Sequence, residues 1–168
     1  MKKDKVIFTE ESIVIEDNTR SVVMDKAAKA ITDIHSYVVC QNKGDVLDIG
    51  FGMGYSADKI YELADSYTCI EINPQIYKRA SEWAKKRSNV SIVFGDWFEV
   101  IPQMGMTYDG IYFDTHNDPN SHLIEEYAGM VSKEGTILSV FNYFNFRDIN
   151  ELNTYKCILD PENFPKLT

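Results

Sequence analysis

The sequence predicts a three-layer α/β fold, in which helices cover both faces of a doubly wound, mostly parallel sheet. The chain has 168 residues, which suits one domain at roughly 100–200 residues per domain. From Asp45 onward, short β-rich segments alternate with helical segments of about 10–13 residues, the pattern of βαβ units. Aromatic residues make up 12% of the chain, which indicates a packed core.

The elements are expected in the following order. Residues 1–20 alternate weakly in hydrophobicity and are predicted to form an N-terminal arm with one or two short extended pieces, and 21–168 a single domain. Residues 21–40 have apolar side chains at helical spacing, so a helix is expected there. Further on we expect strands at 45–49, 67–72, 90–94, 108–114 and 135–141, helices at 56–64, 74–86, 97–101 and 121–131, then a short helix at 147–152 and a strand at 154–159.

The composition of the chain argues against several classes of binding partner. The chain has 17 basic and 26 acidic residues, a net charge of −9. An acidic surface repels phosphate, so we expect no nucleic-acid partner and no binding to anionic membranes. The apolar runs are too short for a membrane span, and the N-terminus lacks an apolar leader, so a cytoplasmic location is expected. Cys40, Cys69 and Cys157 form no C-x-x-C pair, so we expect reduced thiols and no metal site.

The first candidate site is the glycine turn after the first predicted strand. Parallel sheets bind ligands outside the carboxyl ends of their strands. Glycines at 50, 52 and 54 allow a close backbone approach, and a helix starting near Tyr55 would aim its free amides at the ligand. The spacing G-x-G-x-G lacks the third glycine of the dinucleotide fingerprint G-x-G-x-x-G, which argues against a pyrophosphate.

Two carboxylates indicate the kind of cofactor. Asp48 would repel a phosphate but suits a cation, and Glu71, at the end of the second strand, can accept hydrogen bonds from ribose hydroxyls. S-adenosylmethionine carries a sulfonium and an ammonium group and no phosphate, so the pair favours this cofactor. Each carboxylate has an alternative interpretation, as a hydrogen-bonded or solvated charge at a strand end.

A polar and aromatic pair follows the third strand. Asp96 can hydrogen-bond an adenine amine, and Trp97 can cover a ring face; alternatively, Trp97 belongs to the core.

After the fourth strand, Asp114 can orient an amine or guanidine and take its proton. His116 and Asn117 are candidates to assist it. The alternatives are a helix-capping role for Asp114 and a merely exposed His116.

These segments together resemble class I S-adenosylmethionine-dependent methyltransferases, and most closely the guanidinoacetate N-methyltransferases and their arginine-methylating relatives. The resemblance covers about residues 20–145 and is carried by Val23-Met24-Asp25, Val46 to Met53, Glu71-Ile72-Asn73, Gly95-Asp96-Trp97 and Tyr108 to Thr115. It implies a Rossmann-like methyltransferase fold whose C-terminal sheet hairpin is shortened or missing. It also implies that Asp114 binds and deprotonates the acceptor nitrogen.

The expected cofactor-binding residues, from the residues and the resemblance together, are Met24, Asp48, Gly50, Phe51, Gly52, Met53, Gly54, Tyr55, Glu71, Ile72, Asn73, Asp96, Trp97 and Asp114. The expected catalytic residues are Asp114 and His116, while His35 and His122 are expected on helix surfaces. By ungapped count, Ala28 stands where the family has a second acceptor-binding glutamate.

The expected function is therefore transfer of a methyl group from S-adenosylmethionine to a nitrogen of a small, cationic amine or guanidine acceptor. The alternatives are a protein arginine methyltransferase and a non-catalytic module that binds the cofactor, because the fold alone does not determine the function. The sequence leaves the oligomeric state open.

Overall fold

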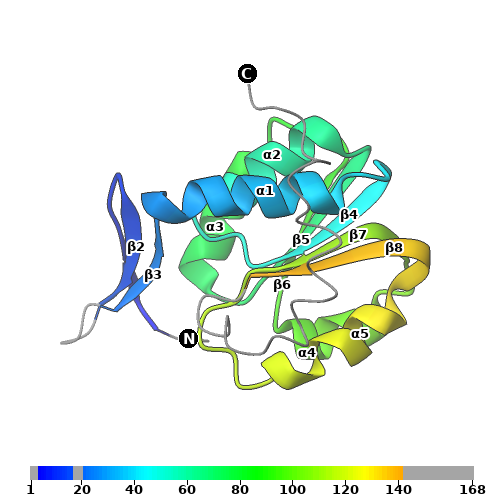
Figure 1. Ribbon diagram of the computed structural model, residues 1–168. Coiled ribbons are helices and arrows are strands. Elements are labelled where there is room, and N and C mark those ends of the chain that lie inside the picture. Colours follow the sequence, from blue (N-terminus) through cyan, green and yellow to red (C-terminus); the bar gives the residue numbers. More distant parts are fainter. Residues whose placement is uncertain (1–3, 17–20, 142–168) are drawn as a thin grey trace.

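The computed structural model describes residues 4–16 and 21–141 and shows a five-stranded parallel sheet between two layers of helices (Figure 1). The strands are β4 (Asp45–Ile49), β5 (Ser66–Glu71), β6 (Val90–Phe94), β7 (Tyr108–Phe113) and β8 (Ser132–Val140). Their order is β6-β5-β4-β7-β8, and all neighbouring pairs are parallel. The direction of winding reverses between β4 and β7, which confirms the doubly wound fold and places a ligand crevice at that point.

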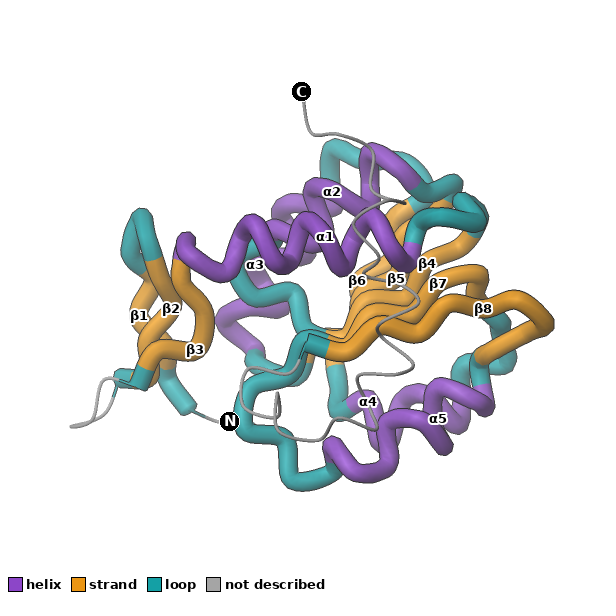
Figure 2. Tube along the Cα trace, viewed as in Figure 1, coloured by secondary structure: helices purple, strands orange, loops and turns teal. Residues whose placement is uncertain are grey.

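Helices cover both faces of this sheet (Figure 2). On one face lie α1 (Lys29–Val39), α2 (Tyr55–Leu63) and α3 (Pro74–Ala84), and on the other α4 (Trp97–Val100) and α5 (Ile124–Met130), with short 3₁₀ turns at Lys26–Ala28, Ile101–Gln103 and Ser121–Leu123. Because strand side chains alternate between faces, two hydrophobic clusters form. Val46 and Tyr112 belong to one, and Leu47 and Phe113 to the other.

The N-terminal residues form a small antiparallel sheet of β1 (Val6–Phe8), β2 (Ser12–Ile15) and β3 (Val22–Asp25). This confirms the predicted extended pieces. The Gln75 side chain of α3 holds β1 at both backbone groups of Val6, accepting from its N–H at 2.8 Å and donating to its carbonyl at 3.3 Å. Ile13 of β2 is fully buried, so the small sheet packs on the main core.

The predicted helix over 21–40 is wrong in its first third. Residues 22–25 form β3, where Met24 pairs with Ile13, and α1 begins only at Lys29. Asp25 sets the start of the helical turn, because its extended backbone lets its carboxylate accept from the Ala28 N–H at 3.1 Å. The buried face of α1 also differs from the expected stripe. Ile31 is 47% exposed, whereas the buried residues of α1 include Thr32 and Ser36.

The other predicted elements agree with the structure within one to three residues at each end, β8 starting at Ser132 rather than 135. The predicted helix at 147–152, the strand at 154–159, Cys157 and the expectation about the C-terminal hairpin lie outside the described residues.

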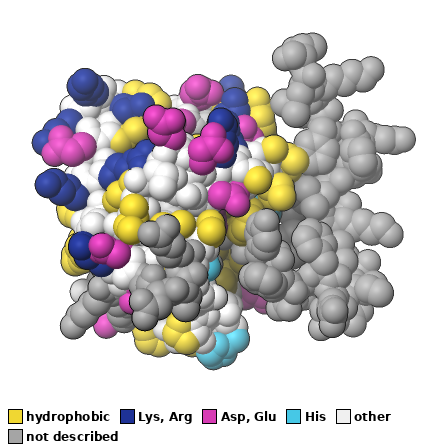
Figure 3. All heavy atoms as spheres, turned by 90° about the vertical axis from the view of Figure 1, so that its left-hand side faces the viewer, with side chains coloured by type: hydrophobic (Ala, Val, Ile, Leu, Met, Phe, Trp, Pro, Cys, Tyr) yellow, Lys and Arg dark blue, Asp and Glu magenta, His cyan; other side chains and the backbone are white. Residues whose placement is uncertain are grey.

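Within residues 4–16 and 21–141, no helix has the length and apolar character needed to cross a membrane. Basic and acidic side chains are intermingled on the face that carries β1–β3 (Figure 3).

Candidate functional site

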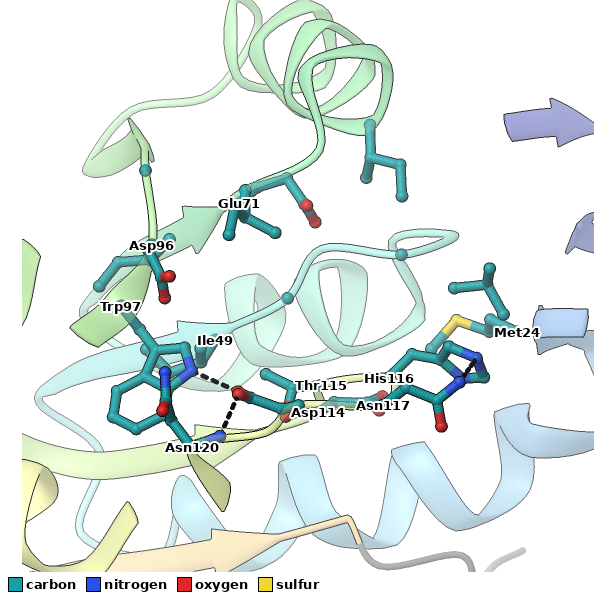
Figure 4. Close-up of a pocket in the computed structure, with 18 of the residues that line it drawn as sticks. Met24, Ile49, Glu71, Asp96, Trp97, Asp114, Thr115, His116, Asn117 and Asn120 are labelled. Atoms are coloured by element: carbon teal, nitrogen blue, oxygen red, sulfur yellow. Dashed lines mark hydrogen bonds between the residues drawn. The ribbon is translucent and has the colours of Figure 1, made fainter. Parts of the chain in front are cut away.

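A pocket of about 200 Å³ opens at the carboxyl ends of β4, β5, β6 and β7, beside the reversal in strand order. Trp97 lies at one end of it and Met24 at the other (Figure 4). The lining residues are Val23, Met24, Ile49, Gly50, Gly52, Ile70, Glu71, Ile72, Ile76, Gly95, Asp96, Trp97 and 114–120. The pocket is therefore where the topology predicts a ligand.

The glycine turn after β4 brings the strand ends close together. Gly50 has a φ of +99°, and its N–H donates to the Ile70 carbonyl at 2.9 Å. A Cβ at this position would lie 2.2 Å from the Asp114 carbonyl oxygen. Gly50 is thus required for the approach of β4 to the end of β7. At Gly52, a Cβ would meet the Met24 sulfur at 2.8 Å.

Glu71 is buried at the end of β5 and is anchored by backbone donors. Its Oε2 accepts from the Phe51 N–H at 2.9 Å and its Oε1 from the Asn73 N–H at 2.7 Å. Burial raises the pKa of this carboxyl, and hydrogen bonds from backbone N–H groups oppose that rise. A carboxylate has about four acceptor sites, so Glu71 retains capacity for ligand hydroxyls.

Asp114 follows β7 and lines the same pocket. Burial, and then the charge of Glu71, raise the pKa of its carboxyl to about 7, while the Tyr112 hydroxyl, which donates to Oδ2 at 3.4 Å, opposes this rise. A carboxyl that titrates near neutral pH has the proton affinity of an effective general base.

Asp48 lies beneath the pocket rather than in its lining, although it was predicted to contact the cofactor. It is fully buried, and its Oδ2 accepts from Ser56 Oγ at 2.7 Å and from the Tyr67 hydroxyl at 2.8 Å. Its Oδ1 has no hydrogen-bond partner among the described residues. Burial raises its pKa to about 7, and the charges of Asp114 and Glu71 add to that shift.

Trp97 belongs to the core, as its alternative interpretation predicted, and it also lines the pocket. It is 4% exposed and packs edge-on against Phe113 at 5.3 Å between ring centroids, yet it lines the pocket. Its indole N–H donates to Asp118 Oδ2 at 2.5 Å, which connects α4 to the loop after β7. The carboxylate of Asp96, also in the lining, accepts from the Phe98 N–H at 3.3 Å and caps α4.

The loop after β7 brings His116 and Asn117 to the pocket, their side-chain nitrogens 2.9 Å apart (Figure 4). Burial lowers the pKa of His116. The prediction that His35 lies on a helix surface is wrong. Its ring stacks on Tyr112 with centroids 5.2 Å apart, and its Nδ1 lies 2.6 Å from Ser139 Oγ. His122, by contrast, is exposed.

The structure brings together most of the predicted site residues, but not all. Those in the pocket lining are Met24, Gly50, Gly52, Glu71, Ile72, Asp96, Trp97, Asp114 and His116, and those outside it are Asp48, Phe51, Met53, Gly54, Tyr55 and Asn73. Phe51 and Asn73 instead hold Glu71 through their backbone N–H groups. Sequence reasoning missed Asp118 and Asn120, which a turn signal at Asp118-Pro119-Asn120 marks without revealing that they face the pocket.

The charge of the lining indicates which ligand it fits. Glu71, Asp96, Asp114 and Asp118 supply carboxylates, and the lining residues that the structure describes include no Lys or Arg. Such a pocket favours cations and disfavours phosphates. A doubly wound sheet with an acidic pocket at its switch point is the arrangement of a class I methyltransferase rather than of a dinucleotide-binding enzyme.

Comparison with known proteins defines the family. The sequence model of the family described as guanidinoacetate N-methyltransferase matches residues 17–158. The chain therefore belongs to the guanidinoacetate N-methyltransferase family, and the resemblance to class I S-adenosylmethionine-dependent methyltransferases is confirmed.

Curated relatives are similar over most of this chain. The chain is 30% identical over 161 residues to protein arginine N-methyltransferase 2 of Kluyveromyces lactis, with 85% of this chain and 37% of that protein covered. It is 30% identical over 155 residues to the protein of the same name from Candida glabrata, with 84% and 36% covered. The chain thus spans little more than a third of the length of these relatives.

Solved structures support the fold. An O-methyltransferase from Bacillus cereus, solved in complex with SAH, has a TM-score of 0.60 at 17% identity and covers 80% of this chain and 70% of its own. Spermidine synthase from Thermotoga maritima has a TM-score of 0.62 at 16% identity, covering 94% and 62%. At these identities the likeness concerns the fold alone.

Proposed function

We propose that this chain transfers a methyl group from S-adenosylmethionine to a nitrogen of a small cationic acceptor of the amine or guanidine type. The observation that carries the proposal is the placement of Glu71 and Asp114 in one pocket with no described lysine or arginine in its lining. Glu71 ends β5 and Asp114 follows β7, the two strands on either side of β4. Membership of the guanidinoacetate N-methyltransferase family supports it.

The described residues fit this cofactor. Glu71 would accept from the ribose hydroxyls, Asp96 and Trp97 would flank the adenine, and Met24 with the glycine turn would enclose the methionine part. Bound there, the cofactor supplies an electrophilic methyl group on a positively charged sulfur. The surrounding carboxylates stabilise a cation, and their raised pKa values indicate that they are poorly compensated without one.

Asp114 is proposed to hold the acceptor and to take its proton. A carboxylate forms charge-assisted hydrogen bonds with a guanidinium or ammonium group, which fixes the direction of the reacting nitrogen. An ammonium nitrogen has no free lone pair, so Asp114 takes one proton from the reacting nitrogen before or as the methyl group is transferred. His116, whose lowered pKa keeps it neutral at pH 7, lies in the pocket lining and is proposed to assist as a second proton acceptor.

An arginine side chain of a protein is the second candidate acceptor, because relatives at 30% identity are named protein arginine N-methyltransferase 2. Free guanidino compounds and arginine residues present the same cation to Asp114, so the pocket chemistry serves both.

A module that binds the cofactor without catalysis is the third alternative. A cytoplasmic location is also proposed, supported by the free buried thiols of Cys40 and Cys69.

The test is methyl transfer from isotope-labelled S-adenosylmethionine to small amines, guanidino compounds and arginine peptides. Asp114→Asn should lower the rate by about 10²–10⁴-fold while cofactor binding, measured by calorimetry, is retained. The matched control is Asp109→Asn, on the same strand but at its other end, which should leave the rate near wild type. Transfer at the wild-type rate by Asp114→Asn would refute the role of Asp114, and absence of cofactor binding by the wild type would refute the proposal.

A further inference from the structure

We propose that Tyr112 is a positioning residue for Asp114: the Tyr112 hydroxyl orients the carboxylate toward the acceptor nitrogen, while the His35 ring, stacked on Tyr112, holds the tyrosine in place. This inference rests on the proposed function of Asp114. Tyr112 is a buried and His35 a half-buried side chain, and neither has a part in the chemistry proposed above.

Tyr112 is joined to Asp114 by a side-chain hydrogen bond. Tyr112 lies in β7 and Asp114 directly follows that strand, two residues further along the chain. The Tyr112 hydroxyl donates to Asp114 Oδ2 at 3.4 Å. Among the described residues it is the one side chain that hydrogen-bonds this carboxylate. The distance is long, as is common for catalytic hydrogen bonds before substrate binds. The interaction leaves the other carboxylate oxygen available to an acceptor.

The side chain of Tyr112 is held rigidly by its neighbours. Tyr112 is fully buried in the core cluster under α1, α2 and α3. The His35 ring from α1 stacks on it with an interplanar angle of 20°, and His35 Nδ1 lies 2.6 Å from Ser139 Oγ on β8. The Phe141 ring lies 5.7 Å from that of His35. A side chain fixed on several sides has little rotamer freedom, which is the requirement for holding a catalytic group.

The Tyr112 hydroxyl also affects the protonation of the Asp114 carboxyl. Asp114 interacts by charge with Asp48 on β4 and Glu71 on β5. The titratable groups that line the same pocket are Asp96, His116 and Asp118, and His35 on α1 stacks on Tyr112. Burial lowers the pKa of His35 to about 4, so it is neutral while Asp114 titrates. The Tyr112 hydroxyl favours the ionised form of Asp114, against burial and the charge of Glu71. Loss of that hydroxyl should therefore raise the proton affinity of Asp114.

The experiment is a ¹³C NMR titration of the Asp114 carboxyl in wild type and Tyr112→Phe, with the resonance assigned from Asp114→Asn. The variant should move the titration midpoint upward by about one pH unit, and the acid limb of kcat/KM should move with it. Tyr108→Phe removes a buried hydroxyl from the other end of β7 and is the matched control, expected to leave the midpoint in place. An unshifted midpoint in Tyr112→Phe overturns the proposal.

A second pair of variants tests the wall behind Tyr112. His35→Phe keeps an aromatic ring against the tyrosine and should leave the Asp114 midpoint near wild type, whereas His35→Ala should raise it. Equal midpoints in both variants and the wild type would overturn the role of His35. Because the titration needs no turnover, a shift in Tyr112→Phe together with an inactive wild type would refute the proposed function and not the positioning.

Discussion

Gly50→Ala is the substitution whose effect follows most directly from the geometry. Its Cβ would lie 2.2 Å from the carbonyl oxygen of Asp114. The Asp114 backbone is fixed there, because its N–H donates to the Ile49 carbonyl at 2.9 Å. Neither partner can move without separating β4 from the end of β7. The φ of +99° adds backbone strain that alanine tolerates poorly.

The magnitude combines the two contributions. A non-glycine residue in such a conformation costs about 1–3 kcal/mol, and overpacking against a fixed neighbour costs about 1–3 kcal/mol more. The free energy of unfolding should therefore fall by about 2–6 kcal/mol. Methyl transfer should fall further than stability explains, because the relief of the clash displaces Asp114.

Gly52→Ala is the matched control in the same turn. Gly52 also has a positive φ, +52°, but its Cβ would meet the flexible Met24 side chain, with the sulfur at 2.8 Å, rather than backbone. We expect a loss of only about 1–2 kcal/mol. Urea denaturation of both variants measures the difference, with m-values checked for two-state behaviour. Equal losses in the two variants would refute the argument that the approach of β4 to β7 depends on Gly50.

Three further predictions concern the carboxylates and Trp97. Glu71→Gln can accept from only one of its two backbone donors, so the affinity for S-adenosylmethionine should fall by about 10–100-fold in calorimetry; unchanged affinity would exclude Glu71 from the binding site. Asp48 has a pKa raised to about 7, so the native state keeps a proton that the unfolded state releases above about pH 4, and stability should fall as the pH rises from about 4 to 7. Asp48→Asn should flatten that dependence and be more stable than the wild type at pH 8 by about 1–4 kcal/mol, and a parallel pH curve for the two proteins would contradict the burial of a neutral Asp48. Trp97→Phe loses the donor to Asp118, and should lower the free energy of unfolding by about 1–3 kcal/mol and weaken cofactor binding, whereas wild-type stability in thermal unfolding would show that this bond contributes nothing.

Strict local patterns allowed much of the fold to be predicted. The strands from Asp45 onward are short, β-rich and bounded by turn signals, so they were found within a few residues. The start of α1 was missed because Val23 fits a helical spacing with Ala27 and Ala30 as well as it fits a strand. What decides between them is pairing with β2, together with the Asp25 cap, and pairing partners distant in sequence cannot be read from a local window.

The pocket residues that could be predicted from the sequence are those at the carboxyl ends of the strands. Glu71 and Asp114 line one pocket because parallel strands bring their carboxyl ends to the same edge. Asp48 shows the limit of that argument. It precedes the glycine turn as a strand-end carboxylate should, yet Ser56 and Tyr67 hold it below the pocket. The role of His35 was also hidden, since its partners Tyr112 and Ser139 come from two strands far along the chain.

The most direct test of the central claim is a crystal structure of the full chain with S-adenosylhomocysteine and a guanidino compound. We expect ribose hydroxyls within hydrogen-bond distance of Glu71, the adenine beside Asp96 and Trp97, and the acceptor nitrogen facing the Asp114 carboxylate. A cofactor bound outside the pocket at the ends of β4, β5, β6 and β7, or an acceptor nitrogen turned away from Asp114, would contradict it.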